Sequence, residues 1–170
     1  TRLLYFPSCL VPSAPLPPPK SRSNRALLRC ALSGGSAEGH RRSDCDDTEV
    51  MFRALSERGS EIDIHGAGTA MRFLTSFFAV CEGEEHVLTG SERMKQRPIS
   101  ALVNALRELG ADIDYVEREG FPPLRIKGRK LQGGTISLPA DISSQYVSSL
   151  LMIAPMLEQG LTVNLCGEVP

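Results

Sequence analysis

Three stretches of thirteen residues decide the fold: KSRSNRALLRCAL (20–32), GTAMRFLTSFFAV (68–80) and SSQYVSSLLMIAP (143–155). Each opens with small polar groups and then becomes strongly apolar. This pattern predicts helices that are apolar nearly all round and therefore buried. Two other stretches, DDTEVMFRALSERG (46–59) and RPISALVNALRELG (97–110), are amphipathic and end in charge followed by glycine. We expect these two to form helices that cover the buried ones from outside.

Glycine-containing breaks follow the helical stretches, and most breaks lead into a short alternating segment, which indicates an α/β fold class. We expect helices to begin near Ser21, Thr48, Thr69, Pro98 and Ser144. We expect strands over 61–65, 85–89, 112–116, 124–127, 135–138 and 161–165. The last strand has no evident partner. The two alternating kinds of helix also indicate an internal repeat, in which the buried helices run parallel and their N-termini converge.

The start of the first helix is unusually polar. Free backbone N–H groups and a partial positive charge at a helix N-terminus attract anions. The residues gathered there add a cationic and hydroxyl-rich set: Lys20, Ser21, Ser23, Asn24 and Arg25. Ordinary capping is the competing interpretation, because Ser, Asn and Pro are common at helix starts whatever the function. The local residues leave both interpretations open, and the three helices could share nothing more than common caps.

The composition excludes several other classes of function. The 170 residues carry 19 basic and 20 acidic side chains, and this net charge of −1 does not favour binding to nucleic acid or an acidic membrane. The five cysteines, at positions 9, 30, 45, 81 and 166, form no Cys-x-x-Cys pair, which predicts reduced thiols, no metal site and a cytoplasmic protein. The apolar runs are too short to span a membrane. Since the first residue is Thr, we expect the sequence to be a fragment.

Four blocks in this order resemble one enzyme family: LPPPKSRSNRALL (16–28), HGAGTAMRFLT (65–75), LTGSERMKQRPI (88–99) and ISSQYVSSLLMIAP (142–155). They are similar to EPSP synthases, the 3-phosphoshikimate 1-carboxyvinyltransferases, and the match covers only the front part of that family's chain. The resemblance implies repeated βαβαββ units with parallel buried helices and outer sheets, an inside-out α/β barrel that is incomplete here. It also implies that residues 1–19 belong to the other domain, whereas 20–170 form an incomplete substrate-binding domain of about two and a half repeats.

The activity that the resemblance implies is transfer of the enolpyruvyl group of phosphoenolpyruvate to the 5-hydroxyl of shikimate 3-phosphate. The reaction is an addition followed by elimination of phosphate, without a metal or an organic cofactor. The implied partners are these two small molecules, and we expect the full-length protein to be a monomer that binds neither nucleic acid nor membrane. The family's proton-transferring carboxylates lie beyond this chain, so we expect the chain alone to be inactive.

The resemblance also implies two overlapping sets of ligands. For shikimate 3-phosphate they are Lys20, Ser21, Arg25, Ser143, Ser144 and Gln145. For phosphoenolpyruvate they are Lys20, Gly68, Arg97 and Gln145. Lys20 would contact both substrates near the reacting centre, and Arg97 would clamp phosphoenolpyruvate with its forked guanidinium. Arg72 lies one turn further into its helix, and we expect it to be structural and paired with an acid.

The chain departs from the family pattern in ways that leave alternatives open. Gly66 stands where the family commonly has Asn, Phe73 stands where Pro is frequent, and the segment 47–66 is short enough to lack a strand pair. A related transferase acting on a UDP-sugar is less favoured, because Ser21 follows Lys20 and no cysteine occupies a comparable loop. A non-catalytic anion-binding module is the third alternative.

Overall fold

The computed structural model of the chain describes residues 20–35 and 46–167, so the segment 1–19 that we assigned to another domain lies outside the described residues. The helices are α1 (Lys20–Leu32), α2 (Asp46–Glu57), α3 (Gly68–Val80), α4 (Glu92–Lys95), α5 (Ser100–Glu108) and α6 (Ser144–Ile153), with a 3-10 turn at Ala154–Met156. The strands are β1 (Glu61–Asp63), β2 (Glu85–Thr89), β3 (Asp112–Tyr115), β4 (Leu124–Lys127), β5 (Gly134–Pro139) and β6 (Leu161–Cys166).

The strands form two sheets whose topology contains one complete βαβαββ unit. In the first sheet, of order β1-β2-β4-β3, β1 and β2 are parallel, and β4 runs antiparallel to both of its neighbours. The unit reads β1-α3-β2-α5-β3-β4, with the short α4 inserted before α5. The second sheet pairs β5 with β6 in parallel across the α6 crossover. The expected α/β class with repeated units is therefore confirmed, whereas the count of two and a half repeats stays a prediction.

The strand that we expected to lack a partner is in fact paired. β6 is in register with β5 along its whole length, from Gly134 opposite Leu161 to Pro139 opposite Cys166. The expectation was wrong because α6 carries the chain back beside β5, and this long-range pairing is not visible in the local sequence.

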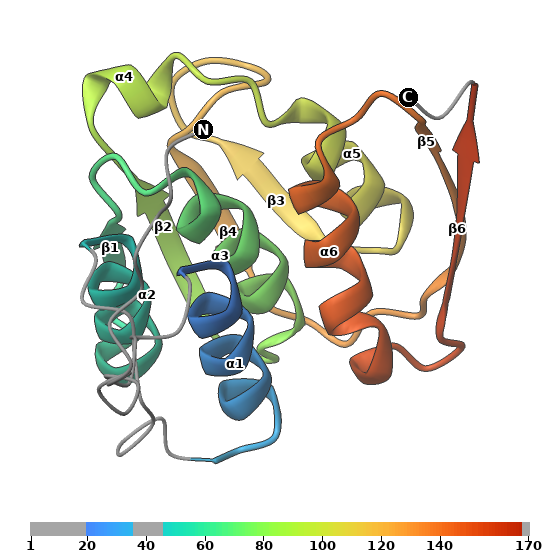
Figure 1. Cartoon of the computed structure of the whole chain (residues 1–170), viewed down its shortest axis with the longest axis horizontal. Helices are drawn as coiled ribbons and strands as arrows, with labels where there is room; N and C mark the ends of the chain where they lie inside the picture. Colours follow the sequence, from blue (N-terminus) through green and yellow to red (C-terminus); the bar gives the residue numbers. More distant parts are fainter. Residues whose placement is uncertain (1–19, 36–45, 168–170) are drawn as a thin grey trace, which may run out of the picture.

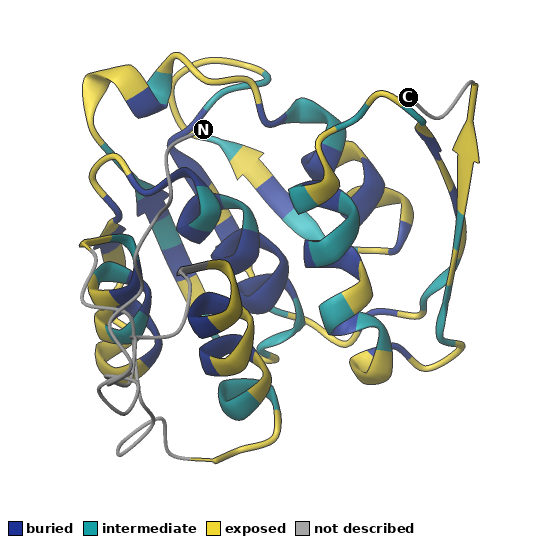
Figure 2. Ribbon diagram, in the orientation of Figure 1, coloured by how far each residue is buried: buried dark blue, intermediate teal, exposed yellow. Residues whose placement is uncertain are grey.

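The three helices with polar starts lie side by side and run in the same direction, with their N-terminal ends toward the top of the view in Figure 1. α3 lies at the centre and contacts α1, α2, α5, α6 and the strands β2 and β4. Most of its residues are buried, and Phe73, Phe77 and Phe78 are the largest side chains in the core (Figure 2). The sequence therefore predicted α3 correctly.

The helix α1 is not apolar all round, which corrects our expectation. Leu27 and Leu28 are fully buried against the core, whereas Arg22, Arg25 and Arg29 are exposed along the opposite face. The physical reason is that α1 packs mainly against the helices α2, α3 and α6, which cover its apolar face. Its charged face is therefore free to line the surface between α1 and α6.

The amphipathic helices cover the buried ones, as expected. α2 packs against α1 and α3 through Thr48, Met51, Ala54 and Leu55. α5 packs against α3, β3 and β5. Between α2 and α3 the chain forms only β1, which agrees with the missing strand pair expected for this short segment.

A buried histidine ties the turn before β1 to β2. His86 is 4% exposed, and its two ring nitrogens lie 2.7 Å from the Gly59 carbonyl oxygen and 2.9 Å from Glu84 Oε2. Arg58 Nη1 donates to the other carboxylate oxygen, 2.6 Å away. Partial burial alone would raise the pKa of Glu84, but the hydrogen bonds from His86 and Arg58 outweigh it and lower the pKa. Burial and the nearby Glu84 carboxylate raise the pKa of the Cys81 thiol to about 12.

Candidate functional site

The predicted ligands lie where α1, α3 and α6 begin, together with the loop between α4 and α5 (Figure 1). Lys20 is the first residue of α1, and its side chain lies outside what the structure describes. Gly68 begins α3, and Ser143 caps α6. Because the three helices are parallel, their free N–H groups and positive dipole ends face the same side of the molecule. The structure therefore places the predicted residues on one side rather than scattering them.

Two arginines approach the backbone at the start of α3. Gly68 is buried, and a Cβ atom built on it would lie 2.9 Å from Arg97 Nη1 and 3.0 Å from Arg72 Nη1. Glycine is needed here for this close approach, because any larger residue would push both guanidinium groups away. Neither arginine forms an ion pair with an acid in the described part of the chain. Two unneutralised cations next to free helix N–H groups form a site suited to an anion.

Arg72 is the site residue that the sequence reasoning missed. Its Nη1 donates to the Gly68 carbonyl oxygen at 2.7 Å, and its guanidinium carbon lies 5.1 Å from the centre of the Tyr146 ring. Its own carbonyl oxygen accepts from Ser149 Oγ at 2.8 Å, which joins α3 to α6. Arg72 is thus structural, as expected, but among the described residues its partner is the Gly68 carbonyl oxygen and not an acid, and it also lies at the predicted ligand position. Helical side chains lean toward the N-terminus, so its spacing of four from Gly68 could have predicted this placement.

A second group of predicted ligands spans α1 and α6. Arg25 Nη2 donates to Ser148 Oγ at 3.3 Å, linking two helices that are 123 residues apart in the sequence. Ser21 and Ser144 each lie one turn before these residues, on the same faces of their helices, and both are exposed. The structure therefore brings Ser21, Arg25 and Ser144 to the same seam between α1 and α6.

The remaining predicted ligands begin α6. Ser143 is the N-cap, and its Oγ accepts from the backbone N–H of Gln145 at 3.4 Å. Ser143 and Ser144 are exposed, whereas Gln145 is half-buried next to Tyr146. Hydroxyls and an amide at a helix start can surround a phosphate without adding charge.

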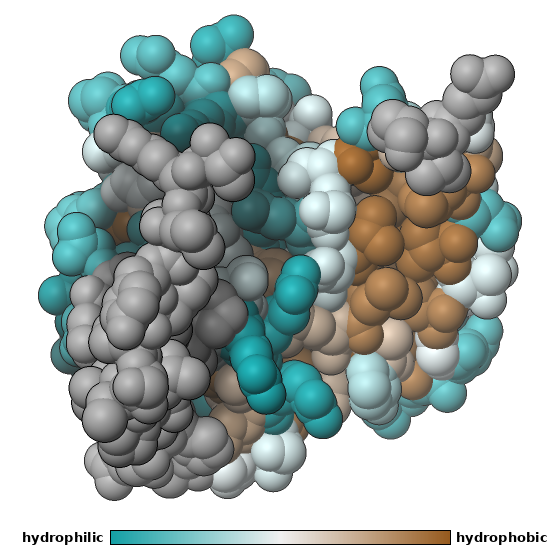
Figure 3. Space-filling view, viewed as in Figure 1, coloured by the Kyte–Doolittle hydropathy of each residue, from teal (hydrophilic) through white to brown (hydrophobic). Residues whose placement is uncertain are grey.

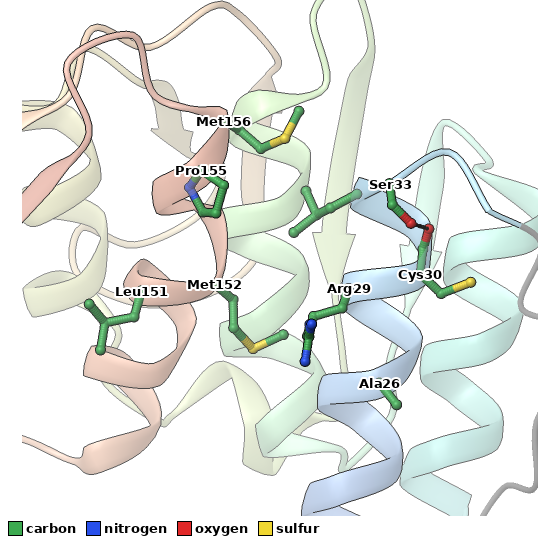
Figure 4. Close-up of a pocket in the computed structure, with 9 residues that line it drawn as sticks. Ala26, Arg29, Cys30, Ser33, Leu151, Met152, Pro155 and Met156 are labelled. Atoms are coloured by element: carbon green, nitrogen blue, oxygen red, sulfur yellow. Dashed lines mark hydrogen bonds between the residues drawn. The ribbon is translucent and has the colours of Figure 1, made fainter.

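A wider hollow lies elsewhere on the described surface. It is a groove of about 760 Å³ between the C-terminal halves of α1 and α6, lined mainly by apolar side chains (Figure 4). Its lining residues are Ala26, Arg29, Cys30, Leu32, Ser33, Leu151, Met152, Pro155 and Met156. Such a lining does not suit multiply charged anions, so we do not assign the substrates to it.

Apolar surface continues from this groove over α6 and β6, where the space-filling view is brown (Figure 3). Leu151 is 52% exposed, Met156 44% and Leu165 45%. No helix in the described ranges is long and apolar enough to span a lipid bilayer.

Comparisons of the chain with known proteins identify its family. The sequence model of the family "EPSP synthase (3-phosphoshikimate 1-carboxyvinyltransferase)" matches residues 57–170. The chain is 56% identical to a 3-phosphoshikimate 1-carboxyvinyltransferase of Bacteroides fragilis over 98% of its own length and 40% of that protein. It is 42% identical to the enzyme of the same name from Vibrio atlanticus over 91% of its own length and 42% of that protein.

The fold is also similar to a solved structure. An EPSP synthase from Acinetobacter baumannii superposes with a TM-score of 0.71 at 24% identity, over 83% of this chain and 38% of that one. The chain thus spans about two fifths of the length of the curated relatives it matches. Since the family model covers most of the chain, and its topology is shared with a solved member, this chain belongs to the EPSP synthase (3-phosphoshikimate 1-carboxyvinyltransferase) family.

Proposed function

We propose that this chain supplies one half of the substrate site of an EPSP synthase. The full-length protein would transfer the enolpyruvyl group of phosphoenolpyruvate to the 5-hydroxyl of shikimate 3-phosphate and release phosphate. The observation that carries this proposal is the convergence of Arg72 Nη1 and Arg97 Nη1 on the backbone of Gly68, where α3 begins. Both substrates are multiply charged anions, and this arrangement offers cations and N–H donors to them.

Phosphoenolpyruvate is assigned to the start of α3. Ala67, the N-cap, has no side-chain acceptor, so the first N–H groups of this helix remain available for a ligand. Arg97 would hold the phosphate or the carboxylate with two parallel hydrogen bonds. Arg72 would stabilise the same anion through its charge while keeping its hydrogen bond to the Gly68 carbonyl oxygen.

Shikimate 3-phosphate is assigned to the seam between α1 and α6. The Ser143 and Ser144 hydroxyls would donate hydrogen bonds to the phosphate. Ser21 and Arg25 would contact it from the facing helix. The hydrogen bond from Arg25 to Ser148, which joins the two helices, supports this assignment. We assign Lys20 and Gln145 to both substrates, since each lies at the first residues of a converging helix.

The residues of this chain would bind and orient the substrates rather than move protons. Addition to the enol requires a proton at carbon 3 and removal of one from the 5-hydroxyl, and a group within hydrogen-bonding distance must provide each transfer. No carboxylate among the residues that the structure describes contacts Arg25, Arg72 or Arg97. We therefore propose that the acid–base groups come from outside this chain, and that the full-length enzyme is a cytoplasmic monomer without metal or organic cofactor.

The test is phosphate release by the full-length gene product with phosphoenolpyruvate and shikimate 3-phosphate. A UDP-sugar replaces shikimate 3-phosphate in a parallel reaction. We expect turnover only with shikimate 3-phosphate. Turnover only with the UDP-sugar would favour the related transferase, and binding of shikimate 3-phosphate without any turnover would favour a non-catalytic module.

Titration calorimetry of this chain alone separates binding from catalysis. We expect weak binding of shikimate 3-phosphate and no phosphate release. The change Ser144→Ala, which removes one proposed phosphate contact, should weaken that binding about two- to tenfold. The matched control Ser137→Ala alters an exposed serine on β5 and should leave the binding unchanged.

A further inference from the structure

We propose that Tyr146 is a positioning residue that holds the two arginines of the phosphoenolpyruvate subsite in place, an inference that rests on the proposed function. Tyr146 lies in the first turn of α6 and is 8% exposed. A side chain that is this buried can support its neighbours without contacting a ligand itself. Tyr146 acts through two contacts. One is with the backbone next to Arg97, and the other is with the Arg72 guanidinium.

The first contact fixes the loop that carries Arg97. The Tyr146 hydroxyl donates to the Pro98 carbonyl oxygen at 2.9 Å. The proline ring locks the backbone φ angle immediately after Arg97, so the peptide between the two residues has little freedom. Holding the Pro98 carbonyl therefore also fixes the direction in which the Arg97 side chain leaves the backbone.

The second contact supports Arg72. The Arg72 guanidinium carbon lies 5.1 Å from the centre of the Tyr146 ring, a cation–π distance. The same guanidinium donates to the Gly68 carbonyl oxygen. Arg72, Arg97 and Tyr146 line the same small hollow, of about 10 Å³, so the three side chains lie together. One side chain of α6 thus supports both cations that approach Gly68.

The position of Tyr146 in the chain gives this role a specific readout. Its main chain belongs to the same helical turn as Ser144, which is assigned to shikimate 3-phosphate alone. Removing only the hydroxyl leaves the helix, its cap and those contacts in place. Loss of the Tyr146 hydroxyl should therefore weaken binding of phosphoenolpyruvate and leave binding of shikimate 3-phosphate unchanged.

The experiment compares steady-state kinetics of the full-length enzyme and its Tyr146→Phe variant. We expect KM for phosphoenolpyruvate to rise two- to tenfold, the factor that one net hydrogen bond carries, with KM for shikimate 3-phosphate changed less than twofold. The melting temperature should change little. An equal rise in both KM values, or a normal KM for phosphoenolpyruvate, would overturn the proposal.

Tyr115→Phe is the matched control. The ring of Tyr115 lies 5.1 Å from the Arg107 guanidinium carbon, and its buried hydroxyl has no hydrogen-bond partner among the described residues, so Tyr115→Phe keeps an arginine–ring contact and removes no hydrogen bond. This change should leave both KM values as they are in the wild type. A rise in KM for phosphoenolpyruvate in the control would show that the effect is not specific to Tyr146.

Repeating the change in an Arg97→Ala background tests positioning directly. If Tyr146 acts by orienting Arg97, most of the Tyr146→Phe effect on phosphoenolpyruvate disappears once that guanidinium is absent. A full additional effect would overturn the proposal. Arg72→Lys is the second variant, because lysine keeps the charge but loses the planar group that stacks on the ring, and it should also raise KM for phosphoenolpyruvate selectively.

Failure of the proposed function is distinguishable from failure of this inference. If the wild-type enzyme releases no phosphate from the two substrates, the proposed function fails and the role of Tyr146 fails with it. If the wild-type enzyme turns over normally and Tyr146→Phe matches it, only the role of Tyr146 is refuted.

Discussion

Replacing Gly68 with alanine adds a single methyl group at the position where the two arginines meet the backbone. That Cβ would lie 2.9 Å from Arg97 Nη1, 3.0 Å from Arg72 Nη1 and 3.8 Å from Met94 Cε, whereas ordinary contact begins at 3.4 Å. Each guanidinium therefore has to withdraw by about 0.5 Å to reach an ordinary contact distance. Both clashing atoms are the far ends of flexible side chains, so the fold can adjust without moving its backbone.

The expected effect on stability is small or favourable. Gly68 is the first residue of α3 and does not have a positive φ angle, so alanine fits its backbone conformation. Alanine is also a better helix former than glycine, by up to about 1 kcal/mol in a helix interior. The melting temperature of Gly68→Ala should therefore equal or exceed that of the wild type.

The expected effect on ligand binding is large and selective. A hydrogen bond to a charged group contributes about 1.5–3 kcal/mol, and displacing the guanidinium by this distance would lose about half of it. Hence KM for phosphoenolpyruvate should rise roughly fourfold to twelvefold, with KM for shikimate 3-phosphate nearly unchanged. The assay is phosphate release by the full-length enzyme at varied concentrations of each substrate. An unchanged KM for phosphoenolpyruvate, or a lower melting temperature with equal effects on both substrates, would refute the reasoning.

Three further predictions concern the site and the fold. Arg97→Ala should weaken phosphoenolpyruvate binding by about 2–4 kcal/mol in calorimetry and spare shikimate 3-phosphate, and an equal loss for both ligands would contradict the assignment. Because the pKa of Glu84 is lowered on folding, its carboxylate stabilises the fold above the ordinary pKa of 4.5, and this contribution is lost as the pH falls through the lowered pKa. The difference in unfolding free energy between wild type and Glu84→Gln should therefore shrink in acid. A difference independent of pH would exclude this linkage. Because the Cys81 thiol has a pKa of about 12, a thiol reagent at pH 8 should label the exposed Cys166 and reach Cys81 only after unfolding, as peptide mass spectrometry would show.

The elements that the sequence predicted best have strong local patterns and clear boundaries. The strands at 85–89 and 124–127 were predicted to the residue, because their alternating side chains end at Gly90 and Gly128. The helix α5 begins at Ser100 rather than Pro98, since Ile99 has a ψ angle of 4° with a φ angle of −132°, which is outside the helical range. The four residues of α4 are too few to show a helical period, so this helix was not predicted.

Features that depend on distant segments could not be predicted in the same way. The pairing of β6 with β5 requires α6 to fold back between them, and no local pattern records that return. The helix-start positions of Gly68 and Ser143 followed from their own neighbours in the sequence. The contact between Arg72 and Tyr146 did not, because it depends on how α3 packs against α6 and on the direction of both side chains.

The link between Arg25 and Ser148 has a consequence for how the protein folds. The complete βαβαββ unit lies between α1 and α6 in the chain, so closing this seam joins segments at high contact order. A phosphate held there can bind only after α6 has docked. Substrate would therefore stabilise the fully folded protein and leave folding intermediates unaffected. Protection of the α6 amides from hydrogen exchange would then measure how much of the protein has completed folding.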